Sequence, residues 1–182
     1  MPLWRIHRHI GVGGDQLVAR VAGDDAEQRV GDAVREAEGE RYAELLPEVR
    51  VFPGARDFLA DLHRRGVAVV LASSAKQVEV DVYVDLLGAR EFADWTTSAD
   101  VERTKPAPDL VDAALDRAET RDALVIGDTT WDVVAARRAG VPAIGVLSGG
   151  FAEAELSEAG AIEVYESVMD LHGRIDESAL SG

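Results

Sequence analysis

Nearly continuous apolar runs of strand length alternate with helical patterns from residue 51 onwards. Three of these runs, residues 67–72, 123–127 and 142–147, resemble strands that are buried on both faces of a sheet. The helical patterns between them are long enough for right-handed crossovers that join parallel strands. We therefore expect an α/β fold, with a Rossmann-like, mostly parallel sheet and helices on both faces.

The first 50 residues have a different pattern of polar and apolar residues. They are polar, carry apolar residues at helical spacing (Leu17, Val18 and Val21 among them), and contain no evident strand. Pro53 and Gly54 mark the change of pattern. The sequence thus predicts a helical unit over residues 1–50 and an α/β core over residues 51–182.

Polar residues directly follow the predicted strands. Ser73 follows the first run, Asp128 the second and Ser148 the third. Ligands of such sheets bind beyond the carboxyl ends of the strands, so we expect these side chains to converge at one edge. Lys105 is expected to reach the same edge from a loop.

Two carboxylates, Asp128 and Asp132, stand one helical turn apart after Gly127, a residue that permits a sharp turn and close approach to a ligand. Oxygen ligands with no nearby Cys or His suit Mg²⁺, so both acids are predicted metal ligands. The simpler interpretation is that Asp128 and Thr129 only cap the helix expected from Trp131.

Hydroxyl and ammonium groups upstream suggest phosphate binding. Ser73 and Ser74 lie between a predicted strand and a helix, where hydroxyls and backbone N–H groups can hold phosphate oxygens. Lys105, one of two lysines among the 19 cations, directly precedes Pro106 and Pro108 in Thr-Lys-Pro-Ala-Pro-Asp. The simpler interpretations are a helix N-cap for the serines and an ordinary solvated lysine.

Hydroxyl, ammonium and paired acids in this order resemble motifs two to four of the haloacid dehalogenase-like (HAD) hydrolase superfamily, in its phosphoglycolate phosphatase-like branch. The resemblance covers residues 51–172. It implies a magnesium-dependent phosphatase of small phosphorylated metabolites that works through an aspartyl-phosphate. It also implies that Ser73 binds the transferred phosphoryl group and that Lys105 neutralises phosphate charge and orients the nucleophile. Asp128 would be a Mg²⁺ ligand, with Asp132 as a second acid at the metal.

Residues 1–50 resemble the small helical cap of the same branch. Arg5 and His7 lie where such caps face the site, so they are candidate substrate-binding residues. The simpler interpretation is that His7 and the nearby His9, which are two residues apart and so lie on different faces of a helix, are only solvated.

The family's first motif, Asp-x-Asp-Gly-Thr, which carries the nucleophile, occurs nowhere in the chain. We therefore expect the HAD-like core to lack its central first strand, with unpaired backbone groups along an internal sheet edge. We also expect this 182-residue form to be truncated and inactive as a phosphatase.

Composition limits the partners. The net charge of −15 argues against nucleic acid and anionic membranes, both of which need cationic surfaces. There are no cysteines, no signal-like segment and no run of membrane-spanning length, so a cytoplasmic protein is expected. Two alternatives to the enzyme remain: an inactive remnant that binds phosphate and Mg²⁺, and an acidic interaction module whose motifs are only helix caps.

Overall fold

The structure is a computed structural model that describes residues 1–181. The chain divides into two compact units, Met1–Arg50 and Val51–Gly182. No helix among the described residues is both long enough and apolar enough to span a membrane.

The first unit is helical. It consists of α1 (Leu3–His7), α2 (Gly14–Ala22), α3 (Asp24–Leu45) and the 3-10 turn η1 (Leu46–Glu48). Gly23, with a φ of 90°, separates α2 from α3, and these two helices pack against each other. Val21 is buried in this unit, whereas Val30 and Val34 on the long polar helix α3 are exposed.

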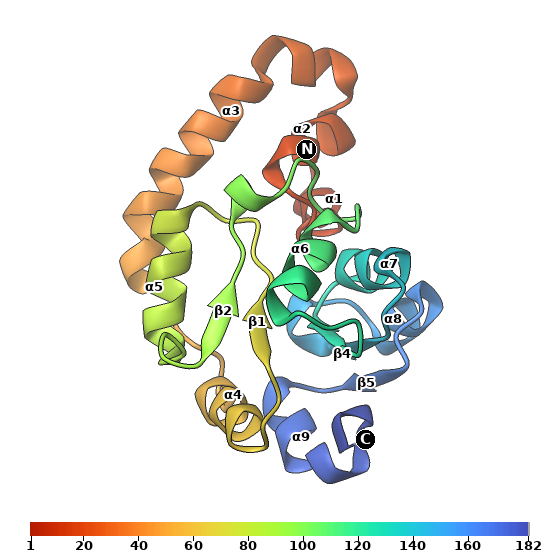
Figure 1. Ribbon diagram of the computed structural model, residues 1–182. Coiled ribbons are helices and arrows are strands. Elements are labelled where there is room, and N and C mark those ends of the chain that lie inside the picture. The colour runs from red at the N-terminus through yellow and green to blue at the C-terminus, as the bar shows by residue number, and fades with distance from the viewer. Residues whose placement is uncertain (182) are drawn as a thin grey trace. The chain divides into compact units, whose positions relative to one another are not determined.

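The second unit alternates strands and helices as predicted (Figure 1). Its first half contains α4 (Ala55–Arg64), β1 (Val69–Leu71), α5 (Gln77–Leu87), β2 (Ala93–Trp95) and η2 (Ser98–Asp100). Its second half contains α6 (Asp109–Ala118), β3 (Val125–Gly127), α7 (Thr130–Ala139), β4 (Ala143–Val146), η3 (Leu147–Gly149), α8 (Glu153–Ala159), β5 (Glu163–Tyr165), α9 (Val168–Gly173), η4 (Ile175–Glu177) and η5 (Ala179–Ser181).

Glycines end two of the helices of the second unit. Gly88 follows α5 and Gly140 follows α7, both in the left-handed conformation, with φ values of 66° and 79°. A residue with a side chain is strained there, and glycine is not. The crossovers are therefore short and return the chain to the sheet.

All strand pairs are parallel, which confirms the α/β prediction, but they form two sheets instead of one. β1 pairs with β2, and β4 pairs with both β3 and β5. In the described part of the chain, no strand pairs with the remaining edge of β1 or with that of β3. The strands have only three or four residues each, so little backbone holds either sheet together.

Helices flank the strands in two groups. α4 packs on α9, and α7 packs on both α6 and α8. α4 and α6 both contact β1, while α7 contacts β3 and β4. The layered arrangement is that of a Rossmann-like α/β fold, as predicted.

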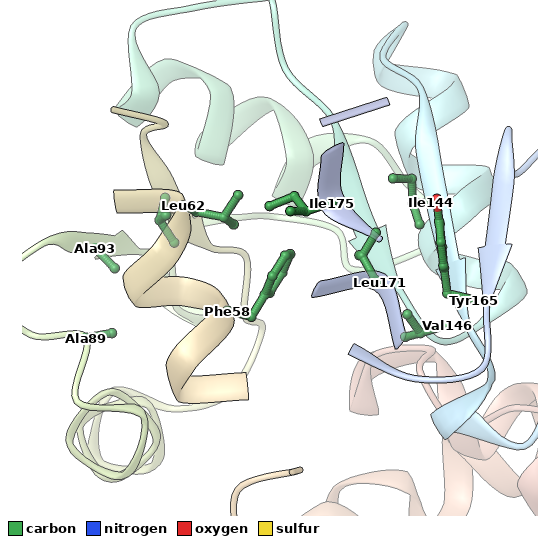
Figure 2. Close-up of a cluster of buried hydrophobic side chains, with 10 residues drawn as sticks. Phe58, Leu62, Ala89, Ala93, Ile144, Val146, Tyr165, Leu171 and Ile175 are labelled. Carbon is green, nitrogen blue, oxygen red and sulfur yellow. The ribbon is translucent and has the colours of Figure 1, made fainter. Parts of the chain in front are cut away.

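One buried cluster links elements that are distant in the sequence. Figure 2 shows Phe58 and Leu62 of α4 between the alanines near β2 and the side chains of β4 and β5. Its buried members are Phe58, Leu62, Val69, Ala89, Ala93, Ile144, Val146, Tyr165, Leu171 and Ile175. Burial of an aliphatic or aromatic side chain stabilises a fold by about 1.5–3 kcal/mol, so this cluster helps to join the two sheets in one unit.

Candidate active site

The turn between β3 and α7 carries the predicted acid pair. Thr129 is the N-cap of α7, and its Oγ1 accepts a hydrogen bond of 3.3 Å from the Asp132 backbone N–H. In return, Asp132 Oδ2 accepts from Thr129 N–H at 3.0 Å and from its hydroxyl at 2.6 Å. The capping interpretation therefore holds for Thr129, with Asp132 completing a capping box, but not for Asp128.

The second oxygen of Asp132 binds Lys105. Lys105 Nζ lies 2.8 Å from Asp132 Oδ1, and the two side chains are only 19% and 13% exposed. Lys105 is thus not an ordinary solvated lysine. Both carboxylate oxygens of Asp132 are engaged, one by the helix cap and one by the ammonium group.

The Lys105 loop is tied to α7 by a second contact. Arg138 Nη1 donates a hydrogen bond of 2.6 Å to the Pro106 carbonyl oxygen. Arg138 and Asp132 both belong to α7, so this helix holds the loop at two points. Sequence reasoning missed Arg138, because no local pattern connects residues 32 positions apart.

Asp128 is half-buried at the end of β3. Ser148 Oγ, in η3 after β4, donates to Asp128 Oδ2 at 3.2 Å. Burial raises the pKa of the Asp128 carboxyl, and the neighbouring Asp132 carboxylate raises it further, while Ser148 and Lys105 lower it. The carboxylate is therefore held beside another negative charge in partly dry surroundings.

Two glycines allow this crowding. A Cβ at Gly127 would overlap the side chain of Asp132, and one at Gly149 would overlap the backbone carbonyl of Asp128. Gly127 has no positive φ, so it is needed for space and not for a sharp turn as the sequence suggested.

Ser73 and Ser74 lie in the loop after β1. α5 begins only at Gln77, so neither serine caps it. The backbone of Ser73 is held by the fully buried Thr96: its N–H donates to Thr96 Oγ1, and Thr96 Oγ1 donates to the Ser73 carbonyl, both at 3.0 Å. Ser73 Oγ accepts from Ala75 N–H at 3.1 Å, which leaves the serine proton for donation to an anion.

Thr96 is a further residue that sequence reasoning missed. It directly follows β2, as Asp128 directly follows β3, and Ser73 lies two residues after the end of β1. The rule that polar residues gather at strand ends would have found it.

Only some of the predicted site residues lie in one cluster. Lys105, Asp128 and Asp132 form one electrostatic cluster with Ser148 at its edge. Ser73 and Ser74 lie on the loop after β1, held by other partners. Arg5 lies in α1 and His7 ends it, in the first unit, so their role stays a prediction.

The donor set around Asp128 suits Mg²⁺. No group of three or more His, Cys, Asp or Glu ligands occurs among residues 1–181. Mg²⁺ does not need one, because it is typically bound by one or two carboxylates together with waters and substrate phosphate. Two acids and one lysine leave a net negative charge that a divalent cation would offset.

Comparison with known proteins shows which family the chain belongs to. The family model described as haloacid dehalogenase-like hydrolase matches residues 4–140. The chain belongs to this family. It is 29% identical to the phosphoglycolate phosphatase of Rhodospirillum rubrum over 91% of this chain and 73% of that protein. It is 28% identical to phosphoglycolate phosphatase 1 of Pseudomonas aeruginosa over 96% of this chain and 67% of that protein.

Solved structures share the HAD-like fold. A hydrolase from Pseudomonas syringae is 32% identical, with a TM-score of 0.91, and the match covers 98% of this chain and 84% of that one. CbbY from Rhodobacter sphaeroides, solved in complex with phosphate, is 26% identical, with a TM-score of 0.73 and coverage of 92% and 78%.

Proposed function

We propose that this HAD-family chain carries the site of a magnesium-dependent phosphatase that acts on small phosphorylated metabolites. The observation that carries the proposal is the pairing of Lys105 with Asp132 at 2.8 Å beside the half-buried Asp128. The Lys105 ammonium group, fixed by Asp132, can bind a phosphate oxygen. The Asp128 carboxylate, which lies beside the negative charge of Asp132, can bind Mg²⁺.

Each residue has a role in this proposal. Asp128 is the principal Mg²⁺ ligand, and Asp132 is the second acid beside the metal, which also fixes the Lys105 ammonium group. Lys105 and the hydroxyl of Ser73, with Ser74 beside it, bind the phosphate oxygens. Bound Mg²⁺ would neutralise charge on the phosphoryl group.

The relatives support the substrate class. Phosphoglycolate phosphatases match most of this chain, and the similar CbbY structure holds phosphate. We propose phosphoglycolate or a sugar phosphate as the substrate type. We also propose that residues 1–50 act as a cap, with Arg5 and His7 contacting the substrate.

A second candidate function is binding without turnover. An aspartyl-phosphate route needs a carboxylate that is free to attack phosphorus. Both oxygens of Asp132 are engaged by Thr129 and Lys105, and Asp128 is assigned to the metal. We therefore predict that the 182 residues by themselves bind phosphate and Mg²⁺ but release no phosphate from esters.

Calorimetric titration of inorganic phosphate in the presence and absence of Mg²⁺ tests the binding part. We expect Mg²⁺-dependent binding by the unchanged chain and none by Asp128→Asn. Asp57→Asn, which alters an exposed acid of α4, is the matched control and should bind normally. Equal binding by all three chains would overturn the assignment of Asp128.

Turnover is measured separately, as phosphate released from phosphoglycolate and from p-nitrophenyl phosphate. Absence of release together with Mg²⁺-dependent binding favours the binding protein. Release by the unchanged chain that Asp128→Asn abolishes favours the enzyme and contradicts the prediction of inactivity. Release that persists in Asp128→Asn contradicts both functions.

A further inference from the structure

The pairing of β1 with β2 continues past the ends of both strands. Thr96 N–H donates to the Leu71 carbonyl at 3.0 Å. One step further along a parallel ladder, the Ser73 N–H would meet the backbone carbonyl of Thr96. It meets the Thr96 hydroxyl instead, at 3.0 Å. A side chain therefore takes the place of the backbone where the chain leaves β1 and enters the loop of Ser73 and Ser74.

A hydroxyl can make a bond here that a carbonyl cannot. A carbonyl only accepts hydrogen bonds, whereas a hydroxyl both accepts and donates. Thr96 Oγ1 accepts from the Ser73 N–H and donates to the Ser73 carbonyl, also at 3.0 Å. Thr96 is fully buried, so both bonds form away from water, where they are stronger. One side chain thus holds both backbone groups of one loop residue.

The far end of the same loop is also tied to the segment after β2. Ser98 N–H donates to the Ala75 carbonyl at 2.9 Å. Thr97, between the two ties, has other partners: its N–H and its hydroxyl donate to Asp100 Oδ2 at 2.7 and 2.9 Å. The loop is therefore held at two points, and both lie on the side of β2.

These ties set the direction of the candidate phosphate donors. The Ser73 carbonyl and the Ser74 N–H belong to one planar, trans peptide unit, so they point in opposite directions. Since the carbonyl is directed at Thr96, the Ser74 N–H points away from it, and no protein group within residues 1–181 accepts a hydrogen bond from that N–H. Ser73 adds its hydroxyl proton, which the bond from Ala75 N–H to its oxygen leaves available.

We propose that Thr96 is a positioning residue for phosphate binding, which fixes the Ser73 hydroxyl and the Ser74 N–H in a binding geometry before the anion arrives. Thr96 acts through these residues and is too deeply buried to contact the anion itself. The inference rests on the proposed function, because it takes Ser73 and Ser74 as phosphate donors. Donors that are already ordered bind more tightly, since little conformational freedom is lost on binding.

Calorimetric titration of inorganic phosphate into the full chain, with Mg²⁺ present, tests the proposal. Thr96→Val keeps the branched shape of the side chain and removes its hydroxyl. We expect it to weaken phosphate binding by about tenfold or more, as loss of a support behind ligand-binding groups typically does. Mg²⁺ binding in the absence of phosphate should stay unchanged. Thr96→Ser retains the hydroxyl and should restore the affinity.

Thr97→Val is the matched control. Thr97 is also buried and also has a hydrogen-bonded hydroxyl, but that hydroxyl binds Asp100 and not the loop of Ser73. Its phosphate affinity should equal that of the unchanged chain. Equal weakening by Thr97→Val, or a parallel loss of Mg²⁺ binding in Thr96→Val, would assign the effect to general loss of structure and would overturn the proposal.

Ser73→Ala separates this inference from the proposed function. If Ser73→Ala weakens phosphate binding and Thr96→Val does not, the positioning role is wrong and the proposed function stands. If the unchanged chain binds no phosphate, or if Ser73→Ala binds it equally well, the proposed role of Ser73 is wrong and the positioning role is wrong as well.

Hydrogen exchange on the unchanged chain gives a second test that needs no variant to fold. Without phosphate, the Ser73 N–H should exchange at least about tenfold more slowly than the Ser74 N–H, because only the former is hydrogen-bonded to a buried group. Added phosphate should slow the Ser74 N–H and leave the Ser73 N–H nearly unchanged. Fast exchange of the Ser73 N–H until phosphate is added would show that the anion orders the loop, and it would overturn the proposal.

Discussion

The Lys105–Asp132 ion pair should contribute more to stability than a surface pair. At 2.8 Å and an effective dielectric constant of about 20, the gross attraction is about 6 kcal/mol. Desolvation of the two mostly buried groups cancels a large part of it. We expect a net coupling of about 1–3 kcal/mol, compared with about 0.2–1 kcal/mol for exposed pairs.

A double-mutant cycle measures this coupling. The free energy of unfolding would be obtained from urea denaturation of the unchanged chain, Lys105→Met, Asp132→Asn and the double variant, with equal m-values as a check. Lys76→Met replaces the other, exposed lysine and should change stability by less than about 0.5 kcal/mol. A coupling below about 0.3 kcal/mol would refute the claim that this pair is a fixed part of the site.

Three further predictions concern the surroundings of the site and the core. Gly127→Ala should destabilise the fold by about 1–3 kcal/mol in urea denaturation, because its methyl group would displace Asp132; an unchanged midpoint would contradict this. Arg138→Met should lower the free energy of unfolding by about 0.5–1.5 kcal/mol, because Arg138 is exposed, and should loosen the Lys105 loop, seen as faster hydrogen exchange there; unaltered exchange would argue against this tether to Pro106. The Arg65 guanidinium lowers the pKa of Asp61, so that pair's stabilisation is fully present above the unfolded pKa of about 3.9 and is lost as pH falls through the folded pKa. Asp61→Asn should therefore have a lower free energy of unfolding than the unchanged chain at pH 7, measured by urea denaturation, and this difference should disappear under strong acid. A difference in free energy of unfolding that is independent of pH would exclude this linkage.

The elements of the α/β core were predictable because their signals are local. Apolar runs and helical spacing are read within a few residues, and Gly88 and Gly140 mark helix ends at the residue level. Strand adjacency depends on contacts between distant residues. The sequence therefore predicted parallel strands and an unpaired internal sheet edge, whereas the pairing of the strands as β1–β2 and β3–β4–β5 is given by the structure.

For the candidate site, local signals likewise located single residues but not the contacts between them. The ends of the predicted strands located Ser73 and Asp128, and a lysine followed by two closely spaced prolines located Lys105. The contact of Lys105 with Asp132 spans 27 residues, and no periodicity encodes it. For the same reason the supports from Thr96 and Arg138 were missed, and the role of Gly127 was assigned to backbone turning when it is a matter of space.

The most direct test of the central claim is to locate a metal at Asp128. Crystals of the chain would be soaked with Mn²⁺, which also prefers oxygen ligands, together with inorganic phosphate, and the ion would be placed by its anomalous scattering. The account predicts a peak at coordination distance, about 2.0–2.3 Å, from an Asp128 carboxylate oxygen, with phosphate between the metal and Lys105. A metal bound elsewhere, or none at Asp128 under saturating conditions, would contradict it.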